Sequence, residues 1–170
     1  MSFAVVANFR ARTGDRHNHR QGATFARADL IDLIVDFVSR LELFSNSPVW
    51  WLCGDRNPSG SPTGGADNLA AGNHARHATY MATVAAYAAS RWNISFQSVE
   101  AFNEPIAGWW KASGTQEGCH FDHSTQAEVA VLLRRELDAQ GLHAVAVAAS
   151  DENTYDMALA TWKVVLTLAF

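Results

Sequence analysis

The sequence predicts an α/β fold in which parallel strands alternate with crossover helices, and it favours part of a (β/α)8 barrel. Helical and short apolar segments alternate along the chain from about residue 24, as parallel sheets with crossover helices require. Each strand candidate is followed by a loop with polar and aromatic residues, as on the site-bearing face of such a barrel. A doubly wound open sheet is the rival, but the sequence contains no G-x-G-x-x-G or P-loop motif.

The composition predicts one globular domain, because 48% of the 170 residues are hydrophobic and 18% are charged. The net charge is −4, and without a basic stripe we expect no nucleic-acid partner and no membrane partner. No apolar run approaches the ~20 residues of a membrane span. Residues 1–21 show no signal peptide, since their apolar stretch is too short and precedes the basic residues.

The first half of the chain predicts a helix, a strand and a long loop. Residues 1–23 show no period and are expected to be irregular, whereas a helical pattern begins at Thr24. Its apolar face consists of Leu30, Ile34, Phe37 and Val38. Residues 41–45 predict a short strand that stops before Pro48. Residues 54–72 contain five glycines and two prolines and predict a loop of a length that is usually functional or disordered.

The second half continues the alternation. A helix is expected over residues 74–92, with His77, Met81, Val84 and Ala88 on one stripe, and a strand over 94–102. After a loop over 106–123, Thr125 and Glu128 suggest a capping box, and Gly141 suggests the end of that helix. Its apolar face is Val129, Leu132, Leu133 and Leu137. Residues 143–149 predict an apolar strand covered on both faces, and a final helix is left open.

The sharpest chemical motif is Asn103-Glu104-Pro105 at the end of the strand over 94–102. Hydrolysis of a glycoside needs an acid that protonates the leaving oxygen and a second carboxylate across the bond. Three letters alone are a weak signal, and a solvated glutamate after a strand is the bland alternative. The apolar strand before it and the tryptophans after it favour catalysis. The six tryptophans are either sugar platforms or packing residues.

The sequence also contains residues that could bind a metal or act as a nucleophile. Cys119 with His123, His74 with His77, and Cys53 are candidate zinc ligands, but they fall in separate loops and a helix. No G-x-S-x-G elbow supports a serine triad. We therefore expect neither a metal nor a cofactor. Whether Cys53 and Cys119 form a disulfide is left open.

Five segments resemble, in order, the fungal endo-β-1,6-galactanases of glycoside hydrolase family 30. They are residues 42–51 (ELFSNSPVWW), 57–60 (NPSG), 98–105 (SVEAFNEP), 116–122 (QEGCHFD) and 150–156 (SDENTYD). The resemblance covers roughly residues 40–162. It implies an incomplete (β/α)8 barrel, roughly strands 3 to 5 with their helices, over residues 28–170, after an atypical or irregular segment over 1–27.

The resemblance also implies a retaining mechanism with Glu104 as the acid/base. It makes Asn103 the ligand of the 2-hydroxyl next to the cleaved bond and Trp50 the wall of that subsite. The other substrate-binding candidates are Asn46, Trp51, Trp109, Trp110, Asp151 and Glu152. The family's nucleophile is a glutamate at the end of the seventh strand, which this chain is expected to lack.

Two functions follow from the resemblance. The first is a retaining hydrolase that acts on β-1,6-galactan side chains of arabinogalactan, with xylan or β-1,6-glucan as weaker options. The alternative is a truncated, catalytically inactive fragment that binds carbohydrate weakly at most. The expected partner is a polysaccharide or oligosaccharide, and the complete protein is expected to be a monomer. The family predicts an extracellular location, although this chain shows no signal peptide.

Overall fold

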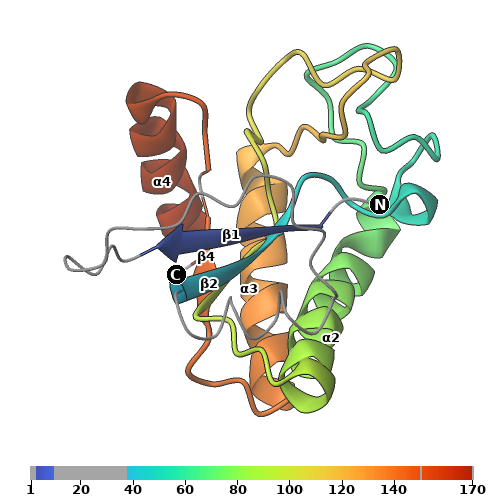
Figure 1. Ribbon diagram of the computed structural model, residues 1–170. Coiled ribbons are helices and arrows are strands. Elements are labelled where there is room, and N and C mark those ends of the chain that lie inside the picture. Colours follow the sequence, from blue (N-terminus) through green and yellow to red (C-terminus); the bar gives the residue numbers. More distant parts are fainter. Residues whose placement is uncertain (1–2, 10–37, 150, 170) are drawn as a thin grey trace, which may run out of the picture.

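The computed structural model describes residues 3–9, 38–149 and 151–169 (Figure 1). Four strands are present: β1 (Phe3–Phe9), β2 (Val38–Ser45), β3 (Ser98–Glu100) and β4 (Ala146–Ala148). The helices are α2 (His74–Trp92), α3 (His123–Ala139) and α4 (Tyr155–Ala169), and two short 3₁₀ turns are η1 (Trp50–Leu52) and η2 (Ala71–Asn73). In these ranges, no helix is both long enough and apolar enough to cross a membrane.

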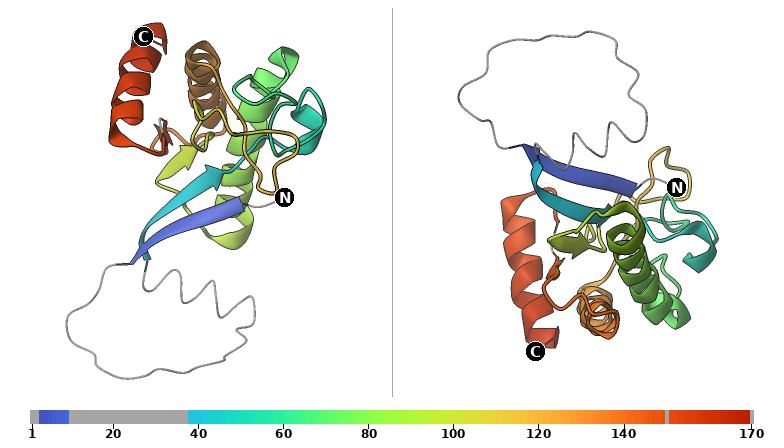
Figure 2. Two further views of the ribbon diagram at one scale, coloured as in Figure 1. Left: turned by 90° about the horizontal axis from the view of Figure 1, so that it is seen from above. Right: turned by 60° about the horizontal axis from the view of Figure 1, so that its bottom comes forward.

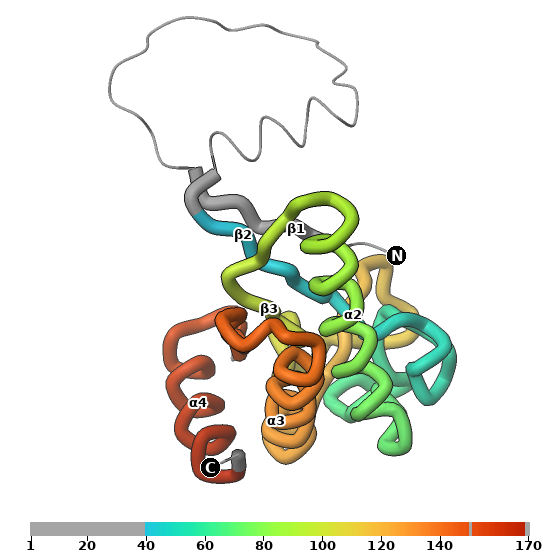
Figure 3. Tube along the Cα trace, turned by 90° about the horizontal axis from the view of Figure 1, so that it is seen from below, coloured from blue at the N-terminus to red at the C-terminus, as the bar shows by residue number. Residues whose placement is uncertain are grey.

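The four strands form one sheet in the order β1-β2-β3-β4. Strands β2, β3 and β4 are parallel, with Leu43 level with Val99 and Val99 level with Val147. The parallel sheet with crossover helices is therefore confirmed. The three helices lie on one face of the sheet (Figure 2), and Figure 3 shows α2, α3 and α4 side by side in that order. This is the arrangement of consecutive β/α units in a barrel wall.

The core lies between the parallel strands and the helices α2 and α3. Leu43 and Val99 point from the sheet into a cluster with Met81 of α2 and Leu133 of α3, and all four side chains are almost fully buried. Helix α2 has the predicted bounds, and its buried stripe is rich in alanine, which allows α3 to approach closely. The predicted apolar stripes of both helices thus set how they pack on the sheet.

Two predictions about the strands need correction. Residues 3–9 were expected to be irregular, but they form β1, which pairs antiparallel with β2. Strand β4 was expected to be covered on both faces, yet Ala146 is exposed and Val147 and Ala148 are only half-buried. Within the described chain β4 pairs with β3 alone, so its other edge stays open. The other residues of the segment 1–27 lie outside the described ranges. So does the helix expected from Thr24, apart from Val38, which begins strand β2 instead.

The predicted capping box at the start of α3 is also wrong. The helix begins at His123 after Asp122. Thr125 instead donates a hydrogen bond to Asp67 of the long loop, and Glu128 contacts His74 of α2 at 3.0 Å. Both side chains therefore connect α3 to other segments rather than closing its own first turn. The end of α3 agrees with the prediction, since Gly141 has φ +76° and its amide bonds back to the carbonyl of Asp138.

Candidate active site

Two loops pack against each other at one end of the sheet, after strands β2 and β3 (Figure 1). The amide of Ala112 donates to the carbonyl of Ser61 at 2.9 Å, and that of Gly118 donates to the carbonyl of Pro58 at 2.9 Å. The side chain of Asn57 adds a bond to the carbonyl of Ala112 at 2.8 Å. The loop predicted over residues 54–72 is therefore ordered by the loop that carries Glu104.

The backbone of Glu104 adopts a left-handed conformation, with φ +45°. Its amide donates to the carbonyl of Asp151 at 2.7 Å, and its own carbonyl accepts from Ala107 N at 2.9 Å and from the indole Nε1 of Trp110 at 3.0 Å. A non-glycine residue in this region costs about 1–2 kcal/mol and persists only where its surroundings hold it. Contacts from its own loop and from the segment after β4 thus fix Glu104 in a strained turn, which is common at functional sites.

Trp110 is a packing residue and not the exposed sugar platform that was predicted. Its side chain is 4% exposed. A Cβ at Gly118 would lie 2.1 Å from the indole ring, and one at Gly60, which has φ +126°, would lie 2.1 Å from the Trp110 backbone. The two glycines therefore leave the space that Trp110 fills, and the buried indole is aimed at the carbonyl of Glu104.

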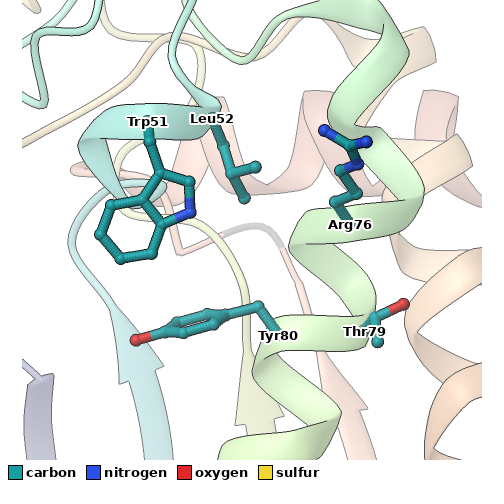
Figure 4. Close-up of a pocket in the computed structure, with 5 residues that line it drawn as sticks. All are labelled: Trp51, Leu52, Arg76, Thr79 and Tyr80. Carbon is teal, nitrogen blue, oxygen red and sulfur yellow. The ribbon is translucent and has the colours of Figure 1, made fainter.

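Trp50, Trp51 and Trp109 are each about half exposed, at 50%, 52% and 49%. Trp50 and Trp51 meet edge to face with ring centroids 5.7 Å apart. Trp51 and Leu52 of η1 line a pocket of about 350 Å³ together with residues of α2, among them Arg76 and Tyr80. The ring of Tyr80 lies below that of Trp51 in Figure 4. Half of each side chain is thus accessible to a ligand, and the role of these three tryptophans as sugar platforms stays a prediction.

Asn46 and Asn103 follow the ends of the neighbouring strands β2 and β3, and both are partly exposed. Because the carboxyl ends of parallel strands lie at the same end of the sheet, both residues lie at the same end of the sheet as Glu104. Their contacts with a sugar stay a prediction.

The two acidic candidates after β4 differ in their environment. Glu152 accepts from Thr161 Oγ1 at 2.9 Å with one carboxylate oxygen and from the amide of Ile106 at 3.3 Å with the other. Its carboxylate therefore joins α4 to the turn of Glu104. Asp151 as a whole residue is exposed, but its carboxyl group is partly shielded from solvent. This desolvation, together with the charge of Glu42, raises its pKa. The two hydrogen bonds of Glu152 therefore indicate a structural role at the site.

Glu100 is an additional feature of the site that the sequence did not single out. It lies on β3, four residues before Glu104, and is 4% exposed, with Oε1 lacking a hydrogen-bond partner in the described structure. Burial, and then the charges of Asp151 and Glu42, raise its pKa well above the ordinary value. Burial therefore favours the protonated form of Glu100. An acidic residue inside a short strand gave no sequence signal of this.

The zinc alternative weighed from the sequence is not supported. Cys53 and Cys119 are buried free thiols, and burial raises the pKa of Cys53 to about 12. His77 is fully buried, contacts the carbonyl of Ala101 at 3.2 Å, and its pKa is lowered by burial to about 4. His74 contacts Glu128, and His123 contacts Thr161. Among the described residues these cysteines and histidines form no group of three metal ligands.

The chain is similar to known glycoside hydrolases. The profile of O-glycosyl hydrolase family 30 matches residues 35–162, which is most of the chain. The chain belongs to this family. It is 58% identical over 122 residues to an endo-beta-1,6-galactanase of Hypocrea rufa, in an alignment that covers 72% of this chain and 25% of the galactanase. The family 30 chain thus spans a quarter of the length of that curated relative.

Solved structures agree on the fold. The catalytic domain of GH30 xylanase C from Talaromyces cellulolyticus matches with a TM-score of 0.64 at 15% identity, over 82% of this chain and 32% of that one. The structure of SrfJ from Salmonella typhimurium matches with a TM-score of 0.61 at 22% identity, over the same shares. The parallel strands β2, β3 and β4 with their helices therefore match part of a family 30 barrel, as predicted.

Proposed function

We propose that this family 30 chain carries the proton-donating part of a retaining endo-β-1,6-galactanase, with Glu104 as the acid/base. The observation that carries the proposal is the strained Glu104 backbone, held by the carbonyl of Asp151, the amide of Ala107 and the indole of Trp110. These hydrogen bonds stabilise a backbone conformation that is intrinsically unfavourable for a glutamate. It fits a residue whose carboxyl must be placed accurately beside a glycosidic oxygen.

The chemistry proposed for Glu104 is proton transfer. Its carboxylic acid gives a proton to the leaving oxygen as the bond to the sugar breaks, and its carboxylate later takes a proton from the attacking water. In a retaining enzyme the second carboxylate lies roughly 5–5.5 Å away and attacks the sugar carbon. We do not assign Glu152 to that role, because hydrogen bonds from Ile106 and Thr161 fix its carboxylate between the turn of Glu104 and α4, and the family resemblance places the nucleophile at the end of the seventh strand.

The substrate is proposed from the similarity to the galactanase of Hypocrea rufa. A β-1,6-galactan, such as a side chain of arabinogalactan, would stack on the half-exposed side chains of Trp50, Trp51 and Trp109. Asn103 would bond the 2-hydroxyl of the sugar that is cleaved. We also propose an extracellular location, since a polymeric plant glycan is met outside the cell.

A second candidate function is a silent carbohydrate-binding fragment. It is favoured by the structural use of Glu152, because the described residues then offer no assigned second carboxylate for a retaining mechanism. The test is reducing-sugar release from β-1,6-galactan by the chain and by its Glu104→Gln variant, with calorimetric titration of a β-1,6-galactooligosaccharide. Release that the variant loses supports the enzyme, and binding without release supports the silent fragment. If the chain neither binds the oligosaccharide nor releases reducing sugar, both candidates are refuted.

A further inference from the structure

Three potential metal ligands from the two loops converge at the start of α3. Asp67 comes from the long loop, and His120 and Asp122 come from the segment that leads into the helix. One ligand atom of each residue lies within 4.8 Å of the others. An isolated β-bridge between Asp67 and His120 brings the two backbones together. We propose that these residues bind a divalent cation of the zinc type that ties the loops together.

The hydrogen bonding of His120 points to a ligand. Its side chain is only 8% exposed, and both ring nitrogens face oxygen acceptors. Nδ1 is 3.2 Å from the carbonyl of Ala107, and Nε2 is 3.2 Å from Oδ1 of Asp122. A neutral imidazole has a single N–H. When Nδ1 donates to the carbonyl, the lone pair of buried Nε2 is therefore aimed at a carboxylate oxygen with no proton between them.

A cation between Nε2 and the carboxylate removes this conflict, because both atoms then become ligands. The bond from Nδ1 to Ala107 fits the same view. Histidines that bind metals almost always donate their other N–H to a carbonyl or carboxylate, which fixes the ring and its tautomer.

The distances also suit a single ion. Zinc binds nitrogen and oxygen ligands at about 2.0–2.1 Å, so two tetrahedral ligands lie roughly 3.3 Å apart. The separation of 3.2 Å between His120 and Asp122 is close to that value. The Asp122 side chain is 69% exposed, so it can turn toward the ion, and water can complete the coordination.

Asp67 is oriented for the same role. Its Oδ1 accepts from the amide of Asp122, and its Oδ2 accepts from Thr125 Oγ1. Each carboxylate oxygen has two lone pairs, so these bonds fix the group and still leave a lone pair for an ion. Among the described residues, no lysine or arginine forms an ion pair with either aspartate. A divalent cation would supply the missing positive charge.

The ligand set selects the kind of ion. Calcium and magnesium prefer oxygen ligands alone, whereas imidazole together with carboxylates suits zinc. The bound ion would also brace the turn of the acid/base candidate, because His120 contacts Ala107 and the amide of Phe121 donates to the carbonyl of Pro105 at 2.8 Å. The inference rests on this packing and not on the proposed hydrolysis.

The test is zinc titration of the chelator-treated chain by calorimetry, together with thermal melting. We expect one equivalent to bind saturably, and a hundredfold excess over Kd to raise Tm by roughly 5–10 °C. Asp122→Asn changes an exposed side chain that makes no capping bond to α3. This variant should fold, and it should lose at least tenfold in zinc affinity.

The matched control is His143→Gln. Its Nδ1 is 3.1 Å from Oδ1 of Asp138, so it forms a similar histidine–aspartate pair, but Arg134 already neutralises that carboxylate at 2.7 Å. The control should bind zinc as the unchanged chain does. Absence of saturable binding at millimolar zinc would overturn the proposal. Equal affinity in Asp122→Asn and the unchanged chain would overturn it as well.

Discussion

The left-handed backbone of Glu104 makes a quantitative prediction about stability. With φ +45°, this position costs a non-glycine residue about 1–2 kcal/mol. Glycine escapes that cost but loses about 0.5–1 kcal/mol through the greater freedom of its unfolded chain. Both Glu104→Gly and Glu104→Ala remove the carboxyl group, so their difference isolates the strain. The glycine variant should be more stable than the alanine variant by roughly 0.5–1 kcal/mol, or about 1–4 °C in Tm.

Thermal unfolding followed by circular dichroism measures this difference on the chain itself. Asn93 provides the control, because it has φ 54° at the end of α2, away from the loops. Asn93→Gly should likewise exceed Asn93→Ala in Tm, which calibrates the strain at an ordinary helix end. If Glu104→Ala melts at or above Glu104→Gly while the Asn93 pair behaves as expected, the strained turn at Glu104 is refuted.

Three further predictions concern the surroundings of the site. Gly118→Ala should lower the free energy of unfolding by about 1–3 kcal/mol in a denaturant titration, because its Cβ would lie 2.1 Å from the adjoining indole; Gly72→Ala, which meets nothing within 4 Å, should not. Glu100 has a raised pKa, so the folded state keeps a proton that the unfolded state loses. The contribution of Glu100 to the free energy of unfolding is fully present below the ordinary pKa of 4.5, and it declines as the pH rises toward the pKa of the folded state. Glu100→Gln should remove that decline, and parallel pH profiles for variant and unchanged chain would contradict this. The thiols of Cys53 and Cys119, whose pKa values burial raises, should react with a disulfide reagent only after unfolding, and fast labelling of the native chain would contradict their burial.

The sequence predicted the helices and the parallel sheet well because their signals are local. In α2, the stripe that includes His77 and Met81 recurs with the helical period, and the structure buries it against the sheet. Gly141 likewise marks the end of α3 through its own backbone preference. The order of helices and strands then fixes the parallel pairing, since crossover helices join neighbouring strands.

The sequence could not predict features that depend on distant partners. Trp110 looks like its neighbour Trp109, and only the close approach of Gly60 and Gly118 buries it. Thr125 fits a capping pattern, but an aspartate 58 positions away offers its side chain another partner. The antiparallel pairing of β1 with β2 also depends on a distant partner, because a seven-residue strand is stable only when it pairs with another strand.

The central claim is that Glu104 transfers the proton in hydrolysis of a β-1,6-galactan. It is tested most directly by a chimera in which the 122 aligned residues replace their counterparts in the galactanase of Hypocrea rufa. The chimera has the rest of that enzyme's barrel, and circular dichroism checks that it folds. We predict that it hydrolyses β-1,6-galactan and that Glu104→Gln lowers its kcat by about 10²–10⁴-fold. A folded, active chimera whose Glu104→Gln variant keeps its rate would contradict the assignment.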